Sequence, residues 1–344
     1  MIEIDGAYGE GGGQALRSSL SLSALTCQPF SIRGIRANRP TPGLAAQHLL
    51  AVRACAKMCG AKLSGDYLGS TALSFAPGRI AGGNHFFDCG TAGSTALVLQ
   101  TLLPPALFAP EPVRLGISGG TENLWAPTSF YLREIFQPLA KRFGASFDVQ
   151  LERIGWYPEG GGALSVSVSP CTGLQPVELA ERGALKGVSG YSVCSGVPFA
   201  VAERQKTRVL KQCVEMGINK AKITALDFPS VGKGSEVFIR AEYAGGLAGF
   251  TALGARGKPA EKVAGEAMHL FKEFHASSAC VDEHAPDQLL LLAALSKGRT
   301  RLRVPTVTRH LETNASVIMQ FLPDAEIFLG ENVEVAGVGF SASR

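Results

Sequence analysis

A glycine-rich turn of nearly the same sequence occurs twice in this chain and constrains the fold more than any other feature. Residues 8–13 are YGEGGG and residues 157–162 are YPEGGG. The first copy follows the alternating apolar residues Ile2 and Ile4 and precedes a helical pattern over 14–24, which is a strand, a turn and a helix. Similar units recur at intervals too irregular for a solenoid, so we expect an architecture of repeated α+β modules.

The periodicity of apolar residues locates the remaining units. It predicts several strands that are followed by helices, and two strands at the end of the chain. The strands are expected at 29–36, 86–90, 301–307, 325–329 and 333–338, and the helices at 44–60, 94–108, 288–295 and from Leu311 onward.

The composition changes near Leu185. Residues 185–276 contain 13 Lys and Arg against 8 Asp and Glu, and glycine-rich turns flank them. Their own pattern predicts strands at 191–198, 222–228 and 235–243 and helices at 200–216 and 259–275. We therefore expect a large domain formed by 1–184 and 277–344, interrupted by a smaller α/β domain at 185–276, which suits 344 residues at about 150 per domain.

Several classes of protein are excluded by composition. No apolar run reaches the roughly 18 residues that a membrane helix needs, and the first residues lack a signal peptide. The eight cysteines are scattered without a CxxC pair, which favours reduced thiols over a zinc or disulfide framework. The sequence predicts a cytoplasmic protein with no membrane partner.

The first glycine turn, residues 9–13, has the chemistry of an anion site. It is neither a P-loop nor GxGxxG, yet consecutive glycines before a helix expose N–H groups to anionic oxygens. Glu10 would then stand where a Mg²⁺ on a phosphate could be bound. The alternative is a tight turn with a solvated Glu10.

Basic residues dominate the segment that follows. No acidic residue lies between Glu10 and Asp66. Arg36 and Arg39 stand in a loop stiffened by two prolines, and two fixed guanidinium groups suit a terminal phosphate. The alternative is a solvated basic surface.

Histidines and acids at two helix starts are the remaining candidates. His310 is expected in the first turn of its helix with Thr308 as N-cap, where the helix dipole keeps the imidazole neutral and nucleophilic. His284, Asp287 and Gln288 precede a buried helix. The alternatives are a structural hydrogen bonder for His310, a surface residue for His284 and an N-cap for Asp287.

Seven segments in order resemble the RNA 3′-terminal phosphate cyclase family across nearly the whole chain. They are residues 5–14, 34–49, 91–94, 119–127, 153–162, 287–288 and 310–314. The resemblance implies a large domain of three repeated β-α-β-α-β-β modules with a smaller inserted α/β domain. It implies an ATP-dependent enzyme that uses Mg or Mn to convert an RNA 3′-phosphate into a 2′,3′-cyclic phosphate. The implied intermediates are adenylyl-histidine and RNA-3′-pp-5′-A.

The same resemblance implies a role for each matching residue. His310 would be the nucleophile and Glu10 the metal ligand. The ATP pocket would comprise Gln100, Pro127, His284, Asp287 and Gln288. The RNA phosphate would be bound by Arg17, Arg36, Arg39 and Gln47.

Three other classes stay open at this point. Non-catalytic cyclase-like proteins of ribosome assembly would lack His310, which is present. Enolpyruvyl transferases resemble the same modular architecture but would lack the 310–314 segment. A plain RNA-binding module would need a broader basic stripe or more aromatic residues than the 8% found here.

Overall fold

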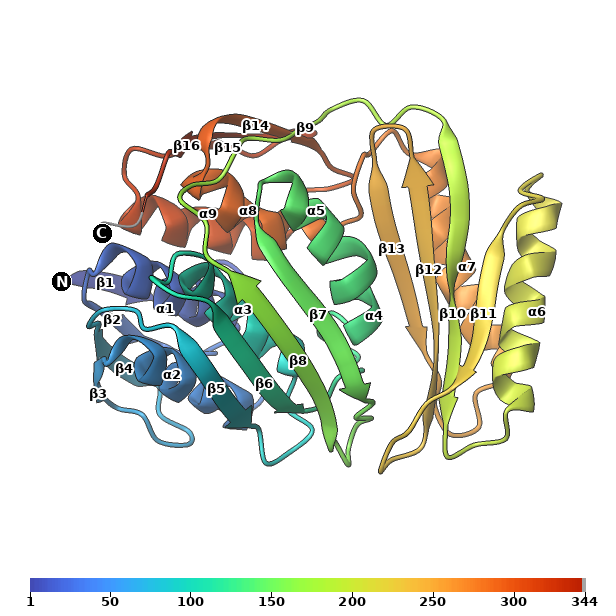
Figure 1. Cartoon of the computed structure of the whole chain (residues 1–344), viewed down its shortest axis with the longest axis horizontal. Coiled ribbons are helices and arrows are strands. Elements are labelled where there is room, and N and C mark those ends of the chain that lie inside the picture. Colours follow the sequence, from blue (N-terminus) through green and yellow to red (C-terminus); the bar gives the residue numbers. More distant parts are fainter. Residues whose placement is uncertain (342–344) are drawn as a thin grey trace.

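The first module begins with the predicted strand and helix. β1 (Ile2–Asp5) passes through the glycine turn into α1 (Gln14–Thr26), and β2 (Phe30–Arg33) pairs in parallel with β1. α2 (Ala46–Cys59) follows, and β3 (Lys62–Ser64) and β4 (Ala72–Ala76) complete a sheet of order β1-β2-β4-β3. The computed structural model describes residues 1–341 of the chain (Figure 1).

Two further sheets have the same pattern of strands. The second contains β5 (Gly83–Asp88), β6 (Val113–Gly119), β7 (Ser146–Arg153) and β8 (Gly162–Ser169) in the order β5-β6-β8-β7. The third contains β9 (Glu178–Leu179), β14 (Lys297–Arg303), β15 (Glu326–Phe328) and β16 (Asn332–Val338) in the order β15-β16-β14-β9. In each of the three sheets one outer pair is parallel and the other two pairs are antiparallel.

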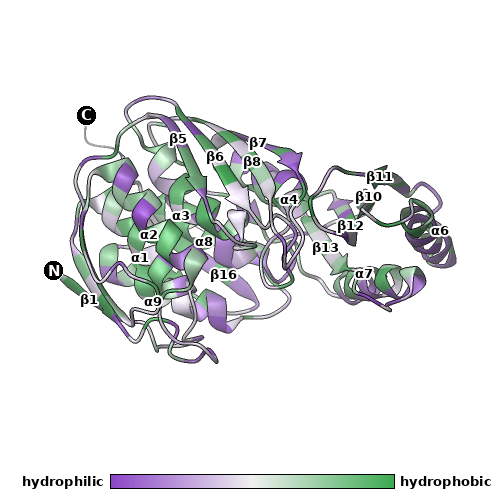
Figure 2. Ribbon diagram, turned by 90° about the horizontal axis from the view of Figure 1, so that it is seen from below, coloured by the Kyte–Doolittle hydropathy of each residue, from purple (hydrophilic) through white to green (hydrophobic). Residues whose placement is uncertain are grey.

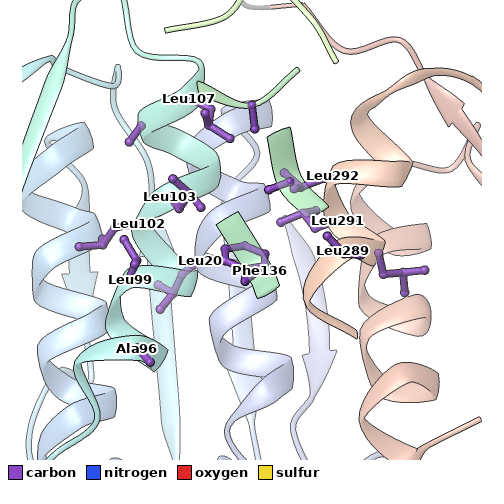
Figure 3. Close-up of a cluster of buried hydrophobic side chains, with 14 of the residues drawn as sticks. Leu20, Ala96, Leu99, Leu102, Leu103, Leu107, Phe136, Leu289, Leu291 and Leu292 are labelled. Carbon is purple, nitrogen blue, oxygen red and sulfur yellow. The ribbon is translucent and has the colours of Figure 1, made fainter. Parts of the chain in front are cut away.

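The helices of these modules form the interior. α3 (Thr95–Leu107) follows β5, and α8 (Ala285–Leu295) and α9 (Arg309–Phe321) flank β14. Between β6 and β7 lie α4 (Ser129–Tyr131), the π-helical turn η1 (Leu132–Phe136) and α5 (Gln137–Arg142). Figure 3 shows Leu20 of α1, Leu103 of α3, Phe136 of η1 and Leu292 of α8 in one buried cluster.

Helix α3 continues through Pro104 and Pro105, although proline usually interrupts a helix. Pro105 has no N–H to donate to the carbonyl of Thr101. The hydroxyl of Ser21 on α1 donates to that carbonyl instead, at 2.7 Å. A neighbouring helix thus satisfies the group that the proline leaves without its usual partner.

Residues 185–276 form a fourth sheet with two helices, at the right of Figures 1 and 2. The strands are β10 (Leu185–Ser195), β11 (Lys222–Asp227), β12 (Gly234–Tyr243) and β13 (Leu247–Leu253), in the order β11-β10-β12-β13. We call these four strands the insert sheet. α6 (Ala200–Glu215) and α7 (Ala260–Ala276) pack on one face with Met268 and Phe271 in a cluster of their own. Phe238 and Leu247 belong instead to the large core.

Two of these strands differ from the prediction. The first begins at Leu185 rather than Tyr191 and ends at Ser195, because its apolar residues Leu185 and Val188 are three positions apart and show no strand alternation. β13 was not predicted at all. Its glycine and alanine residues have low strand propensity, and pairing with β12 supplies the stability instead.

Within residues 1–341, no helix has both the length and the apolar character needed to cross a membrane.

Candidate active site

The first glycine turn packs against the start of α9. The backbone N–H of Glu10 donates to Oγ1 of Thr313 at 3.0 Å, and the Thr313 hydroxyl donates to the carbonyl of Arg309 at 2.8 Å. This contact joins residues that lie at opposite ends of the chain. It brings the Glu10 side chain to the first turn of α9, where His310 lies.

Glu10 and His310 are neighbours at the base of this contact. Oε2 of Glu10 lies 3.7 Å from Nδ1 of His310, and Arg39 forms an ion pair with the other carboxylate oxygen. Neither Glu10 oxygen accepts a hydrogen bond. The Glu10 side chain is only 10% exposed and that of His310 is 45% exposed. The alternative of a solvated Glu10 is therefore wrong.

His310 occupies the helix position that the sequence predicted. α9 begins at Arg309, and the side chain of Thr308 accepts a hydrogen bond from the N–H of Leu311 at 3.1 Å. Burial, followed by the charges of Arg17 and Arg39, lowers the pKa of His310 to about 4. The imidazole is therefore neutral at pH 7 and has a lone pair available for attack.

Arg17 and His48 lie together beside the glycine turn. An added Cβ at Gly13 would lie 2.3 Å from Nε2 of His48 and 2.9 Å from Nη1 of Arg17, so only glycine fits there. Burial, followed by Arg17, Arg36 and Arg39, lowers the pKa of His48 to about 3. Burial lowers the pKa of Arg17 to about 10, which still leaves it charged at neutral pH. The sequence analysis gave His48 no role, because its spacing alone shows no partner.

Arg36 and Gln47 both contact backbone groups of nearby loops. Nη1 of Arg36 donates to the carbonyls of Thr41 and Gly43 at 2.9 and 2.8 Å. Oε1 of Gln47 accepts from the N–H of Ser94, the N-cap of α3, at 2.7 Å. Both residues therefore shape loops at the site, and their contact with an RNA phosphate stays a prediction.

A cavity lies between α1, α3, η1 and α8. It has a volume of about 40 Å³ and is partly open to solvent. Its polar lining includes Gln14, Arg17, Gln100, Asp287 and Gln288. The structure thus brings three of the five predicted nucleotide residues together with Arg17, although they come from three helices.

One carboxylate oxygen of Asp287 in this cavity has no hydrogen-bond partner. Its Oδ1 is buried and accepts no hydrogen bond, and the same holds for Oε1 of Gln288. Burial raises the pKa of Asp287 to about 6, against the opposing effect of His284 and Arg17. Buried polar atoms normally have partners, so these two atoms suit a ligand with hydrogen-bond donors.

The other two predicted nucleotide residues lie outside the lining of this cavity. His284 is the exposed residue before α8, as its surface alternative predicted. Pro127 is half-buried, near the exposed Trp125. The N-cap alternative for Asp287 is wrong, because Asp287 is the third residue of α8 and Asp282 accepts the N–H groups of His284 and Ala285 instead.

A chain of hydrogen bonds that the sequence did not predict joins α1, α9 and α8. Gln14 donates to Ser18 at 3.1 Å, and the hydroxyl of Ser18 donates to Oδ1 of Asn314 at 2.6 Å. The Asn314 amide donates to the carbonyl of Asp287 at 2.6 Å. Asn314 lies one helical turn after His310 and ends the 310–314 segment of the sequence resemblance, but neither signal indicates its partners.

Glu10 also fits a divalent metal that takes most of its ligands from phosphates. Its Oε1 forms an ion pair with Arg39, whereas the buried Oε2 has no hydrogen-bond partner and lies 3.7 Å from an imidazole nitrogen. Mg²⁺ commonly binds one or two carboxylates together with substrate phosphates. No group of three or more His, Cys, Asp or Glu suited to a metal occurs within the described residues 1–341, so a metal held by protein ligands alone does not fit there.

Comparisons with known proteins place this geometry in context. The sequence model of the family described as "RNA 3'-terminal phosphate cyclase" matches residues 8–326. A protein of that name from Trichormus variabilis is 44% identical over 328 residues, covering 93% of this chain and 94% of its own. Another from Pyrobaculum aerophilum is 41% identical over 345 residues, covering 99% of both chains.

A solved structure, EPSP synthase from Acinetobacter baumannii, is 12% identical with a TM-score of 0.25, and the match covers 97% of this chain and 65% of that one. A likeness this low carries no argument about fold or function.

Proposed function

The chain is an enzyme that belongs to the RNA 3′-terminal phosphate cyclase family, and we propose that it converts an RNA 3′-phosphate into a 2′,3′-cyclic phosphate with ATP. The observation that carries this proposal is a neutral His310 at the N-terminus of α9, beside Glu10. A neutral imidazole is a nucleophile, and a helix N-terminus favours phosphate oxygens.

In the first step His310 attacks the α-phosphorus of ATP. A nitrogen–phosphorus bond forms, the bond to the bridging oxygen breaks and pyrophosphate leaves, giving adenylyl-His310. Nδ1 is buried and faces Glu10 at 3.7 Å, so Nε2 is the nitrogen left for attack. Gln100, Pro127, His284, Asp287 and Gln288 would bind the nucleotide.

In the later steps AMP passes from His310 to the RNA 3′-phosphate and forms RNA-3′-pp-5′-A. The ribose 2′-hydroxyl then attacks the RNA phosphorus, closes the ring and releases AMP. Arg17, Arg36, Arg39 and Gln47 would bind the RNA phosphate, because fixed cationic donors stabilise the charge of an in-line displacement. A Mg or Mn ion on Glu10 would neutralise phosphate charge when bound.

We also propose the organisation into domains that the sequence indicated. Three β-α-β-α-β-β modules would form the large domain of 1–184 and 277–344, and 185–276 would be the inserted domain. The shared strand order of three sheets supports the modules. The separate core of Met268 and Phe271 supports the insert. Eight free cysteines among the described residues are consistent with a cytoplasmic location.

The test is the transfer of label from ATP to the protein. The full chain is incubated with α-phosphate-labelled ATP and Mg²⁺ or Mn²⁺, then denatured. We expect an acid-labile label that is absent in His310→Ala and present in His269→Ala, since His269 is an exposed residue of α7. RNA with a 3′-phosphate should remove the label, and RNA with a 3′-hydroxyl should not.

Two outcomes would contradict the proposal. Label that survives in a folded His310→Ala would move the nucleophile elsewhere. No label on the folded wild-type protein would favour the non-catalytic relative instead.

A further inference from the structure

The segment that leaves α7 is bound on both sides before it enters α8. The N–H of Leu247 in β13 donates to the carbonyl of Cys280 at 3.0 Å, and Val281 pairs with Leu247. On the other side the N–H of Cys280 donates to the carbonyl of Arg303 in β14 at 2.9 Å. The start of α8 is therefore joined to the insert sheet through this segment.

The next residue, Asp282, contacts the insert sheet, α4 and the start of α8 through one carboxylate. Its side chain is buried, and Oδ1 accepts hydrogen bonds from the Tyr131 hydroxyl at 2.7 Å and from the N–H groups of His284 and Ala285 at 3.0 and 3.1 Å. Oδ2 accepts from the N–H of Gly249 in β13 at 3.0 Å. A carboxylate that accepts from these N–H groups caps the helix, and its negative charge interacts favourably with the helix dipole.

Gly249 and Tyr131 are both suited to this contact. A Cβ on Gly249 would lie 2.5 Å from Cγ1 of Ile135 and 3.1 Å from Cδ2 of Tyr131. Glycine at position 249 therefore lets β13 approach η1 more closely than a residue with a side chain would. Burial, and next the charge of Asp282, raise the pKa of Tyr131 well above its usual value. The hydroxyl therefore stays a donor across the neutral range.

We propose that Asp282 is a positioning residue for ATP, which fixes the first turn of α8 to the insert sheet and so aligns His284, Asp287 and Gln288. This inference rests on the proposed function, in which those three side chains bind the nucleotide. Asp282 itself does not line the cavity, so it acts through α8. Through Asp282, the insert sheet thereby contributes indirectly to nucleotide binding.

Three variants remove different hydrogen bonds of the Asp282 carboxylate. Asp282→Ala removes all four acceptor contacts. Asp282→Asn keeps an oxygen for the start of α8 but turns an amide N–H₂ toward the N–H of Gly249, which breaks the link to β13. Tyr131→Phe removes one donor and leaves the cap. Ser277→Ala is the matched control, because the Ser277 hydroxyl bonds to Phe274 in the last turn of α7 and to Ala279 just after it, and to neither β13 nor α8.

The measurement uses the full chain and an ATP analogue with an α,β-methylene bridge, which binds but cannot transfer AMP. We expect Asp282→Ala to raise the Kd of the analogue about tenfold, the effect of losing a good helix cap. At saturating ATP the rate of adduct formation should stay within about twofold of wild type. Asp282→Asn and Tyr131→Phe should raise the Kd less, and Ser277→Ala should match wild type.

A second readout follows the helix itself. Hydrogen exchange at the amides of His284 and Ala285 should be faster in Asp282→Ala and unchanged in Ser277→Ala, because only the first variant removes their acceptor.

The possible failures can be told apart. If folded Asp282→Ala and Asp282→Asn bind the analogue as wild type does, the inference is wrong and the proposed function stands. If Ser277→Ala weakens binding equally, the effect is general and Asp282 has no special part. If Asp282→Ala does not fold, Asp282→Asn and Tyr131→Phe decide in the same comparison. If the wild type forms no adduct, the proposed function fails instead.

Discussion

At the scale of residues, the site works by removing water from a few charged and polar groups. Burial, more than any single neighbour, holds the pKa of His310 near 4 and raises that of Asp287 to about 6. The charges of Arg17 and Arg39 also lower the pKa of His310, because a protonated imidazole beside these arginines would be repelled by them. The same arginines that would bind phosphates therefore also keep His310, the proposed nucleophile, neutral.

The pH dependence of adduct formation follows from this pKa. Protonation removes the lone pair of His310, so kcat/KM for adduct formation, which reports the groups of the free enzyme, should fall as the pH drops through about 4. Titration of Asp287 near pH 6 adds a separate step to the same profile, so only the step near pH 4 belongs to His310. The measurement is the initial rate of labelling against pH at ATP concentrations well below KM. A profile with no step near pH 4 would contradict the expectation.

At the scale of elements, three helix starts lie at the proposed site. α9 begins beside Glu10 with Thr308 as its cap, and α8 begins at the carboxylate of Asp282. α3 starts where Gln47 holds the N–H of Ser94. Helix N-termini offer N–H groups and a favourable dipole to anions, which suits a site that is proposed to bind two kinds of phosphate.

The side-chain cap of α9, Thr308, should contribute to the stability of the protein. Thr308→Ala should lower the free energy of unfolding by about 1 kcal/mol, because the N–H of Leu311 loses its acceptor. Thr308→Ser keeps a hydroxyl and is the matched control. Urea denaturation measures the difference, and equal midpoints for the two variants would show that the cap contributes nothing.

At the scale of the whole molecule, two buried acids lie at the junction of the insert sheet with the second sheet. Glu122 follows β6, and Glu236 belongs to β12; both are almost fully buried. Burial raises the pKa of Glu122 to about 7, and burial together with the charge of Glu122 raises that of Glu236 well above its usual value. Folding therefore requires at least one of these carboxyls to bind a proton near neutral pH.

The stability of the whole chain should depend on this pair. Each carboxyl loses its proton near pH 4.5 when unfolded and at a higher pH when folded, so the free energy of unfolding falls as the pH rises from about 4.5. Glu236→Gln removes one of the acids and should stabilise the protein by about 2 kcal/mol at pH 8, with little effect at pH 4.

Glu242→Gln is the matched control, since Glu242 lies on the same strand but pairs with Arg240 at the surface. Thermal melts of both variants between pH 4 and 8 make the measurement. A gain from Glu236→Gln that does not change with pH would exclude the proton as its cause.

Features that depend on near neighbours along the chain could be predicted from the amino-acid sequence. Thr308 and His310 were placed correctly at a helix start, because a cap and a first turn need only consecutive residues. The apolar periods located α1, α3 and α9 to within a few residues, since helix period and buried face are local properties. The motifs also identified Asp287 and Gln288, which line the cavity.

Only the tertiary structure decided what these residues contact. The bond from Glu10 to Thr313, the bond from Asn314 to the carbonyl of Asp287 and the contact of Asp282 with Gly249 all join separate elements. No local pattern specifies such pairs, because they form when packing of the modules brings distant segments together. The pKa of His310 depends on the same packing, since desolvation and charge act through space rather than along the chain.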